Sequence, residues 1–146
     1  MSRGMIDNWI FWALGSAAFA SLTAIFGKIG VTGVDPDYAT FLRTIVILAF
    51  AGALVMARGV AQPLGAMSAR TLTFLGLSGI ATGASWLCYY RALSLGQASQ
   101  VAPVDKLSVV LVAIIGVAAL GEHLTVKNWV GVAMVGGGAI LVALKG

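Results

Sequence analysis

The sequence predicts an all-α integral membrane protein, a single domain spanning residues 1–146 and built as a bundle of five transmembrane helices. Hydrophobic residues make up 60% of the chain and charged residues only 10%, whereas soluble domains carry about 25% charged residues. A chain with so few charges cannot cover itself with a polar surface, so it needs a lipid bilayer as its solvent. Five apolar segments predict helices at about residues 8–30, 38–57, 71–93, 101–121 and 128–145.

The first and third segments are long and free of charge. The first runs uncharged from Trp9 to Gly27 and continues to Gly30, and the third runs from Leu72 to Tyr90. Each approaches the ~20 apolar residues that a membrane-spanning helix needs. A cleaved signal peptide is the alternative for the first segment, because Arg3 precedes it, but the apolar run is longer than a signal core.

The second segment reaches a spanning length only if it includes a charge. Thr44 to Ala57 is uncharged but covers roughly 21 Å at about 1.5 Å per residue, which is too short. Extending the helix back to Tyr38 places Arg43 inside it. The preceding Asp35-Pro36 pair supports this start, because Asp caps helices and Pro suits their first position.

The fourth segment behaves in the same way. Leu107 to Gly121 covers roughly 22 Å, so the helix must begin near Pro103 or earlier. Asp105 and Lys106 are then drawn into the membrane or its boundary. Pro103 would leave a backbone carbonyl unpaired, which membrane proteins tolerate where the gap lines a cavity or is buried in protein. Alternatively, Asp105 caps the start of this helix.

The remaining segments complete an antiparallel arrangement. The fifth, Trp129 to Leu144, is slightly short, and Lys127 and Lys145 can extend to the lipid surface at its ends. Short turns join neighbouring helices, except for an interfacial loop at residues 58–70. The GxxxG pair Gly79/Gly83 and the glycine run Gly136 to Gly138 fit either internal packing or, on the fifth helix, a dimer seam.

Ionisable residues gather on one side of the predicted bundle: Lys28, Arg43, Arg91, Asp105 and Lys106. Such residues are costly in lipid and usually mark a polar path. Lys28 and Arg91 can instead extend to the headgroups. Arg43 and Asp105 could form a buried ion pair, or could line a water-filled cavity. With four bases against one acid, such a cavity would favour an anionic or zwitterionic small solute.

The third segment ends in an aromatic cluster next to Arg91. Trp86, Tyr89 and Tyr90 could form the aromatic belt found at bilayer interfaces. Trp86 and Tyr90 also share a helix face with Gly79 and Gly83, so they could instead form the wall of a binding site.

Several functional classes find no support in the sequence. The nine Lys and Arg residues are scattered singly, which argues against nucleic-acid binding. A lone Cys88 and one His argue against metal sites and disulfides. The sequence holds no recognisable catalytic constellation or cofactor motif, so an enzyme is not expected.

The chain resembles the EamA domain of the drug/metabolite transporter superfamily, in its short form of one five-helix repeat. The resemblance covers nearly the whole chain and rests on Trp9 to Trp12, on Arg43, on YYRALSLGQASQVAPVDKLSVVL leading to LGE at Leu120 to Glu122, and on GVAMVGGGAILVAL. It implies solute transport across a bacterial or archaeal inner membrane. Because longer members join two inverted repeats, it also implies a homodimer, with an antiparallel pair as the matching arrangement.

Two sequence features bear on that implication. Basic residues number four on one side of the membrane (Arg3, Arg58, Arg70, Lys127) and three on the other (Lys28, Arg91, Lys145), a near-tie that fits insertion in both orientations. Small multidrug exporters of this superfamily carry a glutamate in their first helix, but this chain has no acid between Asp7 and Asp35. Proton exchange by that route is therefore not expected.

The leading hypothesis is a secondary transporter that works by alternating access. Arg43 and Lys106 would hold an anionic group, with Asp105 as their partner or as a proton site. Trp86 and Tyr90 would form the walls. The alternative is a non-transporting subunit of a hetero-oligomer or a component of a lipid-linked sugar flippase.

Overall fold

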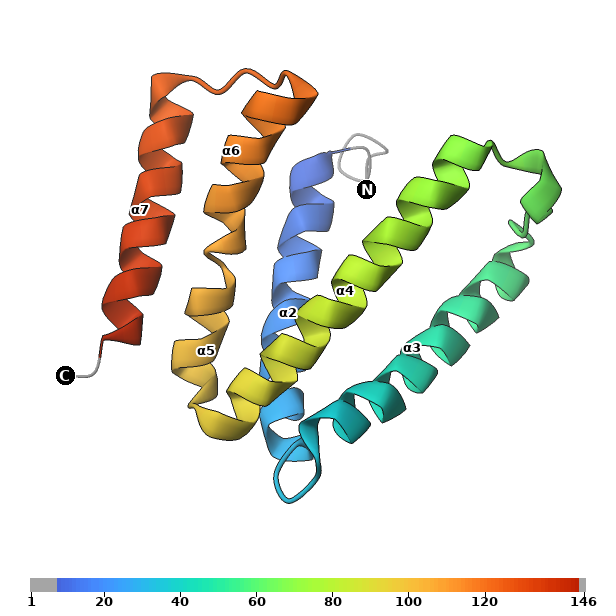
Figure 1. The fold of residues 1–146 in the computed structure, drawn as a ribbon, viewed down its shortest axis with the longest axis horizontal. Coiled ribbons are helices and arrows are strands. Elements are labelled where there is room, and N and C mark those ends of the chain that lie inside the picture. The colour runs from blue at the N-terminus through green and yellow to red at the C-terminus, as the bar shows by residue number, and fades with distance from the viewer. Residues whose placement is uncertain (1–7, 145–146) are drawn as a thin grey trace, which may run out of the picture. The chain divides into compact units, whose positions relative to one another are not determined.

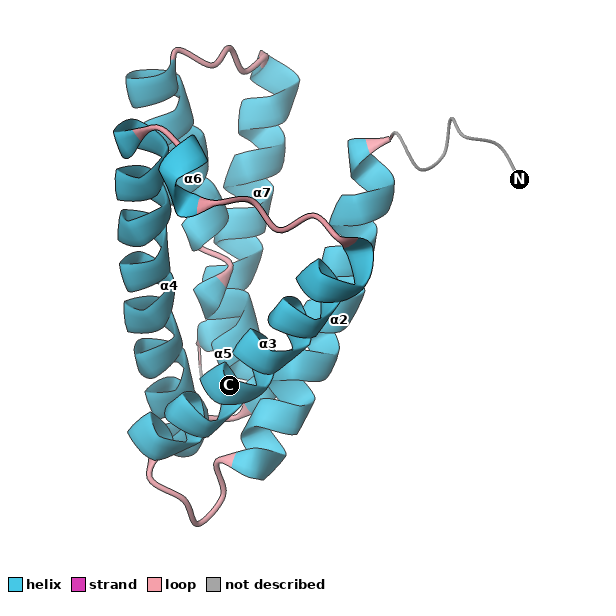
Figure 2. Ribbon diagram, turned by 90° about the vertical axis from the view of Figure 1, so that its right-hand side faces the viewer, coloured by secondary structure: helices cyan, strands magenta, loops and turns pink. Residues whose placement is uncertain are grey.

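The computed structural model describes residues 8–144, and within them it contains helices and no strands (Figure 1, Figure 2). The helices are α2 (Trp9–Gly30), α3 (Pro36–Arg58), the short 3₁₀ helix η1 (Leu64–Ala66), α4 (Ala69–Leu95), α5 (Ala98–Asp105), α6 (Ser108–Leu120) and α7 (Val126–Ala143). With α5 and α6 taken together, five helical spans in this range are long and apolar enough to cross a membrane. The predicted all-α membrane fold is confirmed. Arg3 and Lys145 lie outside the described residues.

The start of α3 follows from its capping residues. The Oδ1 atom of Asp35 accepts hydrogen bonds from the backbone N–H groups of Asp37 (2.9 Å) and Tyr38 (3.1 Å). Pro36 follows at the first helical position, where its missing N–H costs nothing. The helix therefore begins at Pro36, two residues before the predicted Tyr38. This extra length places Arg43 about 10 Å along the helix axis from its start.

Removing this cap is expected to destabilise the hairpin that carries Arg43. Asp35→Ala should lower the free energy of unfolding by about 0.5–2 kcal/mol, because two backbone donors lose their acceptor. Asp35→Asn is the matched control, since it keeps a side-chain oxygen at the same place. Denaturant titration in mixed micelles measures both variants. Equal losses for Ala and Asn would contradict the role of the capping oxygen.

The fourth span is interrupted, whereas the sequence predicted one helix over 101–121. α5 ends at Asp105, and α6 begins at Ser108. Pro103 has no backbone N–H to donate. The hydrogen bonds that follow it have the tighter 3₁₀ pattern, which joins residues three apart. The backbone N–H of Lys106 donates to the carbonyl oxygen of Pro103 (3.0 Å), and that of Val109 donates to the carbonyl oxygen of Lys106 (3.0 Å). Asp105 is the last residue of α5, and α6 has no side-chain cap. The alternative in which Asp105 caps this helix is therefore not what the structure has.

The chain divides into two compact units. One contains the residues up to Lys28 together with those from Leu95 onward, and in it α7 packs against both α5 and α6. Gly136 of α7 is buried there, and a Cβ atom added to it would lie 3.1 Å from Cγ2 of Val110 on α6. Gly136 therefore supports packing inside the chain.

The second unit, residues 29–94, is the hairpin of α3 and α4. The two helices run in opposite directions and are joined by the loop that contains η1 (Figure 1). Gly59 ends α3 with a φ of 61°, a conformation that favours glycine. All residues of the cavity described below come from this hairpin.

Candidate functional site

Arg43 of α3 lies against two aromatic side chains of α4. Its Cζ atom is 4.1 Å from the centre of the Trp86 ring and 5.3 Å from the centre of the Tyr90 ring. Trp86 and Tyr90 are four residues apart, so α4 presents them on one face. A cation over an aromatic face gains about 0.5–2 kcal/mol, with the larger value where water is excluded. The stack therefore holds the guanidinium in a defined place.

The charge of Arg43 is only partly compensated by this stack. Its Nη1 atom is buried and has no hydrogen-bond partner among the described residues. A buried donor without a partner costs about 1–3 kcal/mol, and more when the group is charged. Tyr90 beside it is only 5% exposed. An oxygen of a bound anion would satisfy Nη1 and recover that free energy.

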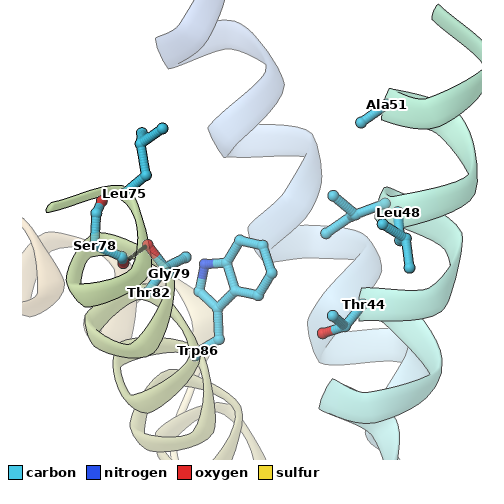
Figure 3. Close-up of a pocket in the computed structure, with 10 residues that line it drawn as sticks. Thr44, Leu48, Ala51, Leu75, Ser78, Gly79, Thr82 and Trp86 are labelled. Atoms are coloured by element: carbon cyan, nitrogen blue, oxygen red, sulfur yellow. Dashed lines mark hydrogen bonds between the residues drawn. The ribbon is translucent and has the colours of Figure 1, made fainter. Parts of the chain in front are cut away.

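An open cavity of about 480 Å³ lies between α3 and α4, and most of the residues that line it are exposed (Figure 3). Its volume falls in the range of small-molecule sites. The cavity is lined by Thr44, Ile47, Leu48 and Ala51 of α3 and by Leu75, Ser78, Gly79, Thr82, Gly83 and Trp86 of α4. Trp86 is thus part of the cavity wall and also carries Arg43 on its ring.

Two of the hydroxyl groups in this wall are oriented by their own helices. Thr44 Oγ1 donates to Thr40 O, and Thr82 Oγ1 donates to Ser78 O, both at 2.8 Å. Because each hydroxyl has a single proton, these oxygens have only lone pairs left for a ligand. The cavity wall therefore offers hydrogen-bond acceptors on an otherwise mostly apolar surface.

Asp105 and Lys106 form a second cluster, in the other unit. Lys106 Nζ lies 3.2 Å from Asp105 Oδ2, with side chains 54% and 36% exposed, respectively. An ion pair this exposed adds little to stability. The cluster marks the break between α5 and α6, about 12 Å along the axis from Ala98. An ion pair between Arg43 and Asp105 stays a prediction.

Lys28 takes part in a specific contact at the end of α2. Its Nζ atom donates a 2.8 Å hydrogen bond to the carbonyl oxygen of Gly96, in the turn between α4 and α5, and the contact is partly buried. Helix ends leave carbonyl groups without intrahelical partners. Lys28 thus supplies a donor where the chain leaves α4. Arg91, the other residue expected to reach the headgroups, is exposed.

The structure brings three of the five predicted site residues into contact within one unit, and the other two into contact within the other unit. Arg43, Trp86 and Tyr90 form one cluster, and Asp105 with Lys106 forms another. Sequence reasoning missed the hydroxyl residues Thr44, Ser78 and Thr82. The signal was present, because positions 78, 82, 86 and 90 repeat every four residues and mark one polar and aromatic face of α4.

Residues 7–144 match the EamA-like transporter family. The chain belongs to this family. A relative from Sinorhizobium sp, named "Uncharacterized transporter in cobO 3'region", is 56% identical over 140 residues, which covers 96% of this chain and 99% of the relative. No solved structure matches. Membership in the EamA-like transporter family, with its multi-pass membrane fold, points to a membrane transporter rather than to an enzyme.

Proposed function

We propose that the chain is a secondary transporter that moves a small anionic or zwitterionic solute across the inner membrane by alternating access. The observation that carries this proposal is the buried, unpartnered Nη1 atom of Arg43 beside a cavity of small-molecule size. A fixed cation with an unused donor is suited to binding an oxyanion. Trp86 forms a wall of the site, and Tyr90 supports Arg43 from a second aromatic face.

The interrupted fourth span supports the same function. Transporters commonly build their sites from discontinuous helices, whose free backbone groups and nearby charges meet the solute or a coupling ion. Here the break between α5 and α6 coincides with the ion pair of Asp105 and Lys106. We assign Lys106 as a second contact for the anionic group, and Asp105 as its partner or as the site of a coupled proton.

The working form proposed is a homodimer with its two copies inverted. The chain has an odd number of candidate spans in its described part, so a second copy in the opposite orientation would generate the inverted symmetry of two-repeat carriers. Accessibility of tags at both termini in intact cells tests this arrangement. Each tag is expected on both sides of the membrane, in two populations of opposite orientation that each have their N- and C-termini on opposite sides, and a single population would contradict the inverted pair.

Flux measurements in proteoliposomes test the transport function and the site together. With a panel of radiolabelled organic acids and amino acids, the wild-type chain should move at least one solute that empty liposomes do not. Arg43→Ala should reduce the initial rate about 30-fold or more, because a charged partner is lost from a buried contact. Asp105→Asn should also reduce the rate.

Arg70→Ala is the matched control for Arg43→Ala. Arg70 also lies over an aromatic ring, that of Phe74 at 5.9 Å, but it belongs to the first turn of α4 and does not line the cavity. Its loss should leave the flux close to that of the wild type. Unchanged flux in both Arg43→Ala and Asp105→Asn would show that the site assignment is wrong.

A further inference from the structure

The cavity and the cation next to it differ in chemistry. Arg43 is absent from the residues that line the cavity, and no lining residue is charged. The wall consists of aliphatic side chains such as Ile47, Leu48 and Leu75, glycines, the Trp86 ring and a few hydroxyl groups. A small, strongly hydrated anion gains nothing from such a wall. A solute with an apolar body gains binding free energy from this wall, because contact with it removes the apolar surface of the solute from water.

The two parts are connected by one side chain. The Trp86 ring lines the cavity (Figure 3). The same ring also carries the Arg43 guanidinium on its face, at 4.1 Å. A solute that fills the cavity with an apolar body and reaches Arg43 with a charged head therefore contacts or displaces this ring. The planar guanidinium matches the two oxygens of a carboxylate.

We infer that the substrate class is organic carboxylates with an apolar body. The apolar body occupies the cavity between α3 and α4, the carboxylate accepts hydrogen bonds from Arg43, and Trp86 is the specificity-determining side chain where the two parts meet. The inference rests on the proposed transport function for its biological meaning, but it concerns binding alone and is tested without transport.

The test uses the full chain in nanodiscs with Trp9, Trp12 and Trp129 replaced by Phe, so that only Trp86 fluoresces. The probes are hexanoate, the matched neutral hexanamide, and acetate, which keeps the carboxylate without the apolar body. Hexanoate should change the Trp86 emission saturably, with a Kd about 10- to 100-fold below those of hexanamide and acetate, because hexanamide lacks the charge that Arg43 binds and acetate lacks the apolar body that the cavity holds.

Two variants distinguish the contact of the carboxylate with Arg43 from the contact of the apolar body with the cavity. Arg43→Gln should remove the preference for hexanoate over hexanamide. Gly79→Leu should weaken the binding of hexanoate and of hexanamide about equally, because Gly79 lines the cavity and the new side chain has open space there. Gly76→Leu is the matched control on the same helix, also with open space but outside the cavity lining, and should bind like the wild type.

Equal affinities for hexanoate and hexanamide, or a preference that survives Arg43→Gln, would overturn the inference. Unchanged binding in Gly79→Leu would overturn the placement of the apolar body. These outcomes differ from a failure of the proposed transport: a chain that moves solutes without carboxylate preference contradicts only the substrate class. A chain with the carboxylate preference but no flux contradicts only transport.

Discussion

Arg43→Met is expected to abolish transport while leaving the chain at least as stable as the wild type. Methionine has a similar length and can keep contact with the rings of Trp86 and Tyr90, since sulfur–aromatic contacts contribute about 0.3–1.5 kcal/mol. The variant loses a cation–π contact of about 0.5–2 kcal/mol. It also removes a buried donor without a partner, which costs about 1–3 kcal/mol or more.

The two ranges combine to between a loss of about 1 kcal/mol and a gain of about 2.5 kcal/mol, and their centre is a gain in stability of about 1 kcal/mol. A residue that costs stability in the empty protein and is needed for activity is typical of a binding site, because sites trade stability for function. Parallel measurements of the thermal midpoint in detergent and of flux in proteoliposomes check the two halves of the prediction. A marked loss of stability in Arg43→Met would instead assign Arg43 a structural role as a clamp between α3 and α4.

Gly136→Leu is expected to cause the largest loss of stability among single changes in α7. Gly136 is buried, and even a Cβ atom there would approach Val110 of α6 to 3.1 Å. A full leucine side chain would push α7 away from α6. Overpacking of this kind costs about 1–3 kcal/mol. In a membrane no hydrophobic burial offsets this loss of stability, because lipid already surrounds the apolar surface of the helices.

Gly137→Leu is the matched control. Gly137 is the next residue on the same helix, is exposed, and has no atom within 4 Å of its added Cβ. Its replacement should change the free energy of unfolding by less than about 0.5 kcal/mol. Denaturation in mixed micelles compares the two variants directly. If Gly137→Leu were the more damaging change, the exposed face of α7 would form the contact that matters, as expected of a dimer seam.

The membrane-spanning helices were predictable because hydropathy is a local sum over consecutive residues. The cap at Asp35 was predictable for the same reason, since its acceptor and the donors of Asp37 and Tyr38 are within three residues of each other. Pro103 indicated that the fourth span is interrupted, but the sequence did not show that the break lies between Asp105 and Ser108. The tightened hydrogen bonds after the proline decide its position, and a single apolar pattern continues through both α5 and α6.

The residues proposed for the site were identifiable from the sequence, and the contacts among them were predictable only in part. Arg43, Trp86 and Tyr90 were each identifiable, because a charge in an apolar run and aromatics on a glycine face are visible in the sequence. Their mutual contact joins α3 to α4 across residues far apart in the chain. The contacts of Arg43 within its own unit are aromatic rings, and its predicted ion pair with Asp105 stays a prediction.

The amino-acid sequence alone predicted a multi-pass membrane protein, the five candidate spans found in its described part, and the inclusion of Arg43 in the second of them. These properties depend on the transfer of consecutive residues from water to lipid. Only the tertiary structure decided that Arg43 stacks on Trp86 with one donor unused, that Gly79 lines a cavity, and that Gly136 packs against Val110. Those facts depend on which helix faces approach each other, and similar small and apolar residues lie on several faces.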